Sequence, residues 1–170
     1  LNLLQKQGTK TYSIGKVIDL FAGQGFTQYR KTKSNAEGVS QLLSLMSAAN
    51  DSFVFVNLID TDQLYGHRLD PEGYAQCLQE IDRAIPPIVN KLGDDDLLII
   101  TGDHGNDPCA ESTDHSREFV PLIVFPAGAA EAQDLGIRNG FFDVAKSIAS
   151  FFGMRNNLPG KSFILSESKI

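Results

Sequence analysis

The stretch "SFVFVNLI", residues 52–59, decides the fold class, because it is a nearly continuous apolar run rich in β-branched and aromatic residues. Such a run is typical of a strand buried on both faces, as in a parallel sheet. "DLLIITGD", residues 96–103, and "VPLIVFP", residues 120–126, have the same character. "TYSIGKVIDLFA", residues 11–22, predicts a further strand that leads into a glycine turn at 23–25.

Helical patterns stand between these runs. "SNAE", residues 34–37, is a capping box and predicts a helix to about residue 49. The residues that this helix should bury are Val39, Leu42, Leu43 and Met46. Asp70 followed by Pro71 predicts a second helix start, and Pro86 and Pro87 should kink that helix or end it early. Its apolar stripe comprises Tyr74, Cys77, Leu78, Ile81, Ile85 and Ile88.

A last amphipathic helix is marked by Phe141, Val144, Ala145, Ile148, Phe151 and Phe152. Strands that alternate with helices predict an α/β fold with a largely parallel sheet flanked by helices. The length of 170 residues fits a single domain, 1–170, whose hydrophobic core is large enough to be stable without disulfides or structural metals.

Composition excludes several classes of function. The net charge is −6 and there is no basic block, which argues against nucleic acid and anionic membrane as partners. No apolar run is long enough to span a bilayer, and no signal peptide opens the sequence. Two cysteines without a CxxC motif fit a reducing compartment, so we expect a cytoplasmic protein.

Polar residues gather where two of the predicted strands end. "DTDQLYGH", residues 60–67, follows the first strand, and "GDHGND", residues 102–107, follows the second. His67 and His104 fall in these segments, and the third histidine, His115, follows in the same loop as His104. Ligands of open α/β sheets bind at the carboxyl ends of the strands. Imidazole and carboxylate without thiolate suit zinc, manganese or iron, and two groups of ligands suggest a metal pair that acts on a phosphorylated substrate.

Other interpretations of these residues stay open. Loop histidines are often solvated, and Asp, Gly and Asn are common turn residues. Ser112 or Ser116 beside His115 could form a nucleophile and base, although no G-x-S-x-G elbow is present. Asp107 and Glu111 fit solvated side chains better than ligands. Cys77 fits core packing.

Two longer elements resemble a known family. "FVNLIDTDQLYGHRLDPEGYAQCLQEIDRAIP" and "LLIITGDHGNDPCAESTDHSREFVPLIVF" closely resemble phosphopentomutases, and "SIGKVIDLFAGQGFT", residues 13–27, does so too. That family belongs to the alkaline phosphatase superfamily of two-metal phosphoryl-transfer enzymes. The resemblance covers essentially the whole chain and implies an alkaline-phosphatase-like core.

The resemblance also implies roles for individual residues. Asp62, His67 and His115 would bind one metal, and Asp103 with His104 would bind the second. The usual metals of the family are two Mn²⁺ ions. Lys16 is a candidate for contact with the substrate's phosphate, although a surface lysine at a strand end would look the same. For Asp60, Arg68 and Arg117 only supporting or structural roles are expected.

The resemblance further implies parts that this chain does not contain. The family's phosphate-accepting threonine, one further aspartate ligand and a sugar-recognising cap domain all precede the matched region. Residues 1–30 would be the return crossing from the cap, and residues 31–170 would belong to the core. The implied activity is that of an isomerase of nucleotide metabolism, which interconverts ribose or deoxyribose 1-phosphate and 5-phosphate through a sugar bisphosphate.

By this resemblance the isolated chain should be inactive, with the remainder of the core and the cap as its partners. Three alternatives remain: another two-metal enzyme of phosphoglycerate mutase or phosphodiesterase type, a non-catalytic metal-binding domain, or a structural fragment.

Overall fold

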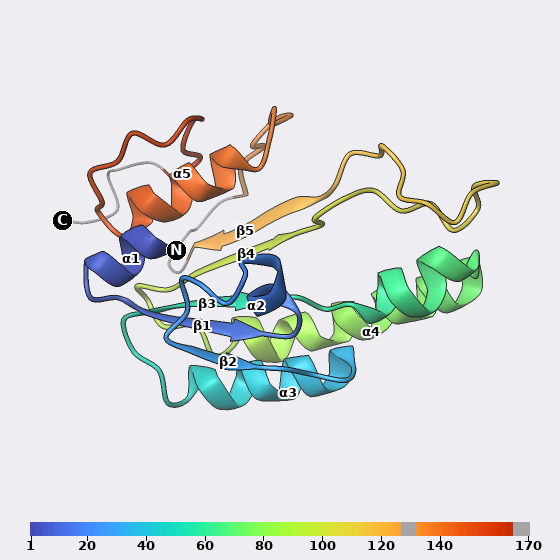
Figure 1. The fold of residues 1–170 in the computed structure, drawn as a ribbon, viewed down its shortest axis with the longest axis horizontal. Helices are drawn as coiled ribbons and strands as arrows, with labels where there is room; N and C mark the ends of the chain where they lie inside the picture. Colours follow the sequence, from blue (N-terminus) through green and yellow to red (C-terminus); the bar gives the residue numbers. More distant parts are fainter. Residues whose placement is uncertain (127–131, 165–170) are drawn as a thin grey trace. The chain divides into compact units, whose positions relative to one another are not determined.

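The computed structural model describes residues 1–126 and 132–164, and the chain divides into two compact units, residues 1–129 and 130–170. The first unit carries the strands (Figure 1). Its elements are α1 (Asn2–Lys6), β1 (Lys10–Ile14), α2 (Val17–Leu20), β2 (Gln28–Arg30), α3 (Asn35–Met46), β3 (Ser52–Val56), η1 (Thr61–Tyr65), η2 (Gly66–Arg68), α4 (Pro71–Val89), β4 (Leu97–Thr101) and β5 (Leu122–Pro126). The second unit contains α5 (Phe142–Phe151). No helix in the described ranges has both the length and the apolar character that a membrane crossing requires.

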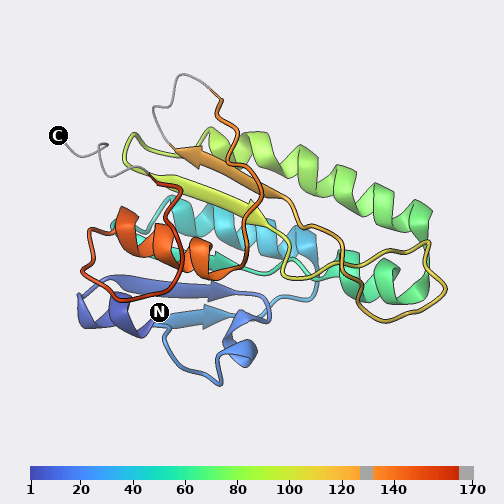
Figure 2. The same cartoon turned by 90° about the horizontal axis from the view of Figure 1, so that it is seen from above.

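A parallel three-stranded sheet forms the centre of the first unit, in the order β2-β1-β3. Tyr12 of β1 lies opposite Val54 of β3, and Ile14 lies opposite Val56. Tyr12 and Ile14 are buried together with Leu45 of α3, so α3 covers one face of this sheet. Figure 2 shows α3 and α4 side by side, and the two helices are in contact. The predicted α/β fold with a parallel sheet flanked by helices is therefore confirmed.

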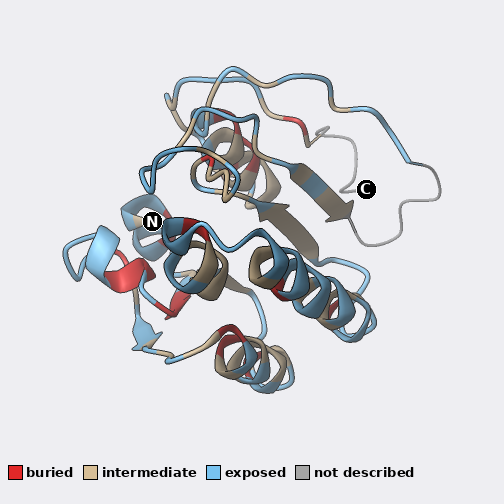
Figure 3. Cartoon of the chain, turned by 90° about the vertical axis from the view of Figure 1, so that its right-hand side faces the viewer, coloured by how far each residue is buried: buried red, intermediate tan, exposed pale blue. Residues whose placement is uncertain are grey.

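The other two strands form an antiparallel pair, in which Ile99 of β4 lies opposite Val124 of β5. Side chains of β4 are mostly half-buried, as the tan colour in Figure 3 indicates. Residues 96–103 and 120–126 therefore contain strands as predicted, each one shorter than its apolar run.

Two strand predictions need correction. Residues 11–22 are not one strand, because β1 ends at Ile14 and the short helix α2 follows. Gly15 has a φ of +90°, which breaks the extended backbone. The run at 52–59 does not give a strand buried on both faces, since Phe55 is 38% exposed. Among the described strands, β3 pairs only with β1, which leaves its other edge without a neighbouring strand.

The helix α3 begins as the capping box predicts. Ser34 Oγ accepts a hydrogen bond from Glu37 N at 3.2 Å. The predicted burial was wrong in detail, because Leu45 is buried whereas the four predicted residues are only half-buried.

The helix α4 also begins as predicted, since Asp70 Oδ1 accepts a hydrogen bond from Gly73 N at 2.9 Å. The expected early end at Pro86 and Pro87 does not occur, because α4 continues to Val89. Each proline removes one donor, and the carbonyls of Asp82 and Arg83 that lose a partner belong to exposed residues, where water can replace it.

Hydrogen bonds of buried polar side chains hold the second unit together. Asp143 is buried, and its Oδ1 accepts a hydrogen bond from Lys161 N at 2.8 Å. Ser147 Oγ donates to Asp143 O at 2.8 Å and accepts from Phe163 N at 2.9 Å. The predicted helix at 141–152 is confirmed as α5. Its buried residues, however, are Asp143, Ser147 and Ala149, and Phe141 is exposed.

Candidate metal centre

The candidate site lies at the carboxyl ends of β3 and β4. After β3 the chain forms η1 and η2, two short helical turns that carry Asp62 and His67. After β4 it forms a long loop, which an antiparallel bridge between Gly105 and Ser116 closes. Ser116 N donates to Gly105 O at 3.1 Å across this bridge. The bridge explains how one loop can present His104 and, eleven residues later, His115 on the same side.

Three of the predicted ligands converge in the structure. Ligand atoms of Asp62, His67 and His115 all lie within 4.8 Å of one another. His67 Nε2 lies 3.3 Å from Asp62 Oδ1, and His115 Nε2 lies 3.4 Å from the same oxygen. The two Nε2 atoms are 3.2 Å apart. The three side chains are 28–47% exposed, so the centre is open to solvent.

Hydrogen bonding determines which ring nitrogen of His67 can bind a cation. His67 Nδ1 contacts Thr113 O, and a carbonyl oxygen can only accept, so Nδ1 must carry the proton. In the neutral ring, Nε2 then has a free lone pair that points at Asp62 and His115. His115 Nε2, 3.2 Å away, either donates a proton to this group or, in its other tautomer, offers a third lone pair to a cation. The donor set of two imidazoles and one carboxylate therefore fits a divalent metal.

A second group of ligands lies on the same loop. His104 Nε2 is 3.6 Å from Asp103 Oδ1. The ring of His104 stacks on that of His115, with centroids 3.6 Å apart and an interplanar angle of 18°. The structure thus brings Asp103 and His104 next to the first group. Two ligands alone make an incomplete metal site, so this half depends on further donors.

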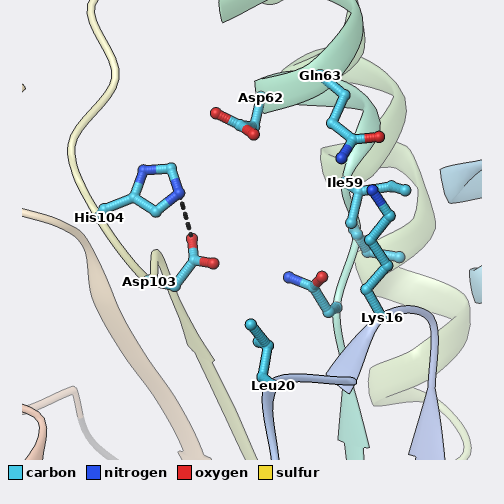
Figure 4. Close-up of a pocket in the computed structure, with 9 residues that line it drawn as sticks. Lys16, Leu20, Ile59, Asp62, Gln63, Asp103 and His104 are labelled. Carbon is cyan, nitrogen blue, oxygen red and sulfur yellow. Dashed lines mark ion pairs between the residues drawn. The ribbon is translucent and has the colours of Figure 1, made fainter. Parts of the chain in front are cut away.

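Lys16 contributes to a pocket that joins both groups. The pocket is lined by Lys16, Leu20, Asn57, Leu58, Ile59, Asp62, Gln63, Asp103 and His104. Figure 4 shows Lys16 and Gln63 on the wall opposite Asp103 and His104. Gly15 explains the position of Lys16, because a Cβ at Gly15 would come within 2.4 Å of Asn57 O. Only glycine lets the ends of β1 and β3 approach so closely.

Asp60 and Asp107 have structural contacts instead of ligand positions. Asp60 Oδ2 accepts from Asn35 N at 2.7 Å, and Asp60 N donates to Asn35 Oδ1 at 3.0 Å. This reciprocal pair fixes the start of α3 beside the strand end. Asp107 Oδ1 accepts from Cys109 N at 2.9 Å and stabilises a turn. The structural role expected for Asp60 agrees with these contacts.

Sequence reasoning missed two residues near the centre. Asn106 Nδ2 donates to Asp62 Oδ1 at 2.7 Å, whereas the pattern suggested only a turn residue. The signal in the sequence that could have indicated this contact was the position of Asn106 two residues after the predicted ligand His104. Burial raises the pKa of Tyr74, and the negative charge of Asp62 raises it further. Tyr74 was assigned to an apolar helix stripe, and no pattern in the sequence indicated its proximity to Asp62.

Comparisons with known proteins show to which family the chain is similar. A family model described as the Metalloenzyme superfamily matches residues 4–156. Curated proteins named phosphopentomutase from Dictyoglomus thermophilum and Acetivibrio thermocellus are 44% and 46% identical to the chain over 164 residues. These alignments cover 96% of this chain and 42% of each relative. The chain therefore spans less than half the length of the curated relatives it matches.

Solved structures support the fold. A phosphoglycerate mutase of Leishmania mexicana matches with a TM-score of 0.73 at 15% identity, over 93% of this chain and 38% of that one. The PH0037 protein of Pyrococcus horikoshii matches with a TM-score of 0.61 at 22% identity, over 75% of this chain and 40% of that one. At these identities the likeness concerns the architecture alone.

Proposed function

The chain belongs to the Metalloenzyme superfamily, and we propose that it forms the metal-binding part of a phosphopentomutase. The observation that carries this proposal is the convergence of Asp62, His67 and His115 from the segments that follow β3 and β4. The names of relatives at 44–46% identity support the choice of reaction. The proposed reaction interconverts ribose or deoxyribose 1-phosphate and 5-phosphate, an isomerisation by phosphoryl transfer within nucleotide metabolism.

Two Mn²⁺ ions are the proposed cofactors. Asp62, His67 and His115 would hold one ion, and Asp103 with His104 would supply part of the second site. Bound divalent metals supply positive charge that neutralises the oxygens of a transferring phosphoryl group. In a chain of net charge −6, this charge lets an anionic sugar phosphate approach the site.

The chain's own residues would orient the metal ligands and bind the substrate's phosphate. The Thr113 carbonyl keeps the proton of His67 on Nδ1, so that Nε2 stays available for a ligand bond. Lys16 lines the pocket that Asp103 and His104 also line, and its ammonium would bind a phosphate of the substrate there. The apolar lining by Leu20, with Leu58 and Ile59, would limit the water around that phosphate.

The remaining parts of the reaction are proposed to come from outside this chain. They are the phosphate-accepting threonine, one further carboxylate ligand, and a cap domain that recognises the sugar and the sugar bisphosphate. Residues 1–30 would return from that cap, and residues 31–170 would complete the core. A cytoplasmic location is part of the proposal, and the two free cysteines, Cys77 and Cys109, are compatible with it.

Mutase turnover by the complete gene product tests this function. The enzyme would be loaded with Mn²⁺, primed with a pentose bisphosphate, and assayed for conversion of ribose 1-phosphate to ribose 5-phosphate. His115→Ala should lower kcat by about 100-fold or more, because removing a ligand costs at least as much as removing its supporting partner. Asp107→Asn keeps the oxygen that accepts from Cys109 N, and it should leave kcat unchanged.

Two results would contradict the proposal. One is conversion of phosphoglycerate with no conversion of pentose phosphate by the complete protein. The other is measurable turnover by the 170-residue chain alone, since the chain is proposed to lack the phosphate-accepting residue.

A further inference from the structure

Asn106 is the closest polar neighbour that the structure gives to the Asp62 carboxylate. Asn106 Nδ2 donates to Asp62 Oδ1 at 2.7 Å, which is shorter than the distances of 3.3 and 3.4 Å from this oxygen to the two imidazoles. A hydrogen bond to a carboxylate is charge-assisted and stronger than one between neutral groups. The amide therefore fixes which oxygen of Asp62 faces His67 and His115.

The contact depends on an exceptionally close approach of two chain segments. A Cβ placed on Gly66 would lie 2.2 Å from Asn106 Nδ2 and 2.6 Å from Asn106 Oδ1. Gly66 is buried at the start of η2, between Asp62 and His67. The η1–η2 segment thus has a glycine at a position where a side chain would push against the Asn106 amide.

Asn106 also links the two groups of ligands. It lies two residues after His104 and three after Asp103, yet it bonds a carboxylate 44 residues away in the chain. The stacking of His104 on His115, within the loop that follows β4, is a further contact between the two groups of ligands. A shift of the 102–107 loop would therefore move Asp103 and His104 and release Asp62 at the same time.

We propose that Asn106 is a positioning residue that orients Asp62 and thereby sets the affinity of the Asp62, His67 and His115 group for a divalent cation. The inference rests on the proposed metal centre and adds a residue that the proposed reaction does not itself require. Supporting partners of metal ligands typically change affinity by about 10–100-fold when removed, and that range is the expected effect here.

Titration of the complete, metal-free gene product with Mn²⁺ alone tests the proposal. Calorimetry gives the affinities, and electron paramagnetic resonance reports the surroundings of bound Mn²⁺. Asn106→Ala should weaken one class of site by about 10–100-fold. Gly66→Ala should do the same, because its Cβ would displace the Asn106 amide. Asp107→Asn, next in the sequence and outside the cluster, is the matched control and should bind as the unsubstituted protein does.

A double-mutant cycle separates positioning from a general effect on the loop. In an Asp62→Ala background, Asn106→Ala should have no further effect on the Mn²⁺ affinity, because its target is gone. An equally large loss in that background, or unchanged affinity in Asn106→Ala and Gly66→Ala, would overturn the proposal. If circular dichroism in chelator shows that Asn106→Ala is unfolded, Asn106→Ser repeats the cycle with a smaller change. Absence of Mn²⁺ binding by the unsubstituted protein would instead overturn the proposed function.

Discussion

Replacing His67 by alanine should remove the stabilisation that a metal gives while changing the metal-free protein little. The side chain of His67 is 40% exposed and has one backbone hydrogen bond partner, Thr113 O. Loss of one such bond at a partly exposed site costs about 1 kcal/mol. The loss of folding stability caused by His67→Ala should be much larger when metal is present.

The metal-dependent part can be estimated from mass action. A ligand at 100 times its dissociation constant stabilises the folded state by about 2.7 kcal/mol. For a chain of this length, 1 kcal/mol shifts the melting temperature by about 2–4 °C, so excess Mn²⁺ should raise it by about 5–10 °C. His67→Ala removes one of three converging ligand atoms, and at the same Mn²⁺ concentration most of this shift should be lost.

Thermal unfolding by circular dichroism, with chelator and then with excess Mn²⁺, provides the measurement. The matched control is Asp107→Asn, which lies outside the cluster and should show the full shift. If His67→Ala were stabilised by Mn²⁺ as much as the unsubstituted protein, His67 would not be a ligand and the reasoning would be refuted.

Two further predictions concern the pocket and the centre. Gly15→Ala should destabilise the protein by about 2–3 kcal/mol in urea unfolding, because its Cβ would come within 2.4 Å of Asn57 O at a φ of +90°. Gly8→Ala, with a similar φ and nothing within 4 Å, should cost about 1 kcal/mol, and equal losses would refute the steric argument. The Tyr74 phenol should titrate above its ordinary pKa of 10.0, as followed by ultraviolet absorbance, and Asp62→Asn should lower this pKa only in part, because burial is the larger cause. The raised pKa contributes stability that is present below pH 10.0 and is lost as the pH rises through the folded-state pKa, so stability that increases in this range would contradict the assignment.

Local chemistry explains which parts of the fold could be predicted from the sequence. Ser34 and Asp70 cap helices through contacts within three residues, so their patterns located α3 and α4 correctly. The end of β1 could not be found in this way, because it depends on how closely Gly15 approaches a carbonyl 42 residues further along the chain. Several residues after Ile14, such as Val17 and Ile18, also favour strands, and tertiary contacts override this tendency.

The candidate site, too, could be predicted only in part. Residues at strand ends were expected to gather, and the structure brings Asp62, His67 and His115 together. The contacts that orient them were not predictable, since His67 meets Thr113 O across 46 residues and Asn106 meets Asp62 across 44. Composition shows that such side chains are present, whereas only the folded chain shows which oxygen or nitrogen each one faces.

Anomalous diffraction from crystals of the complete protein grown with Mn²⁺, recorded at the manganese absorption edge, tests the central claim most directly. The account predicts an anomalous peak bonded to Asp62 Oδ1, His67 Nε2 and His115 Nε2. Well-ordered side chains of these three residues with no anomalous density between them would contradict it.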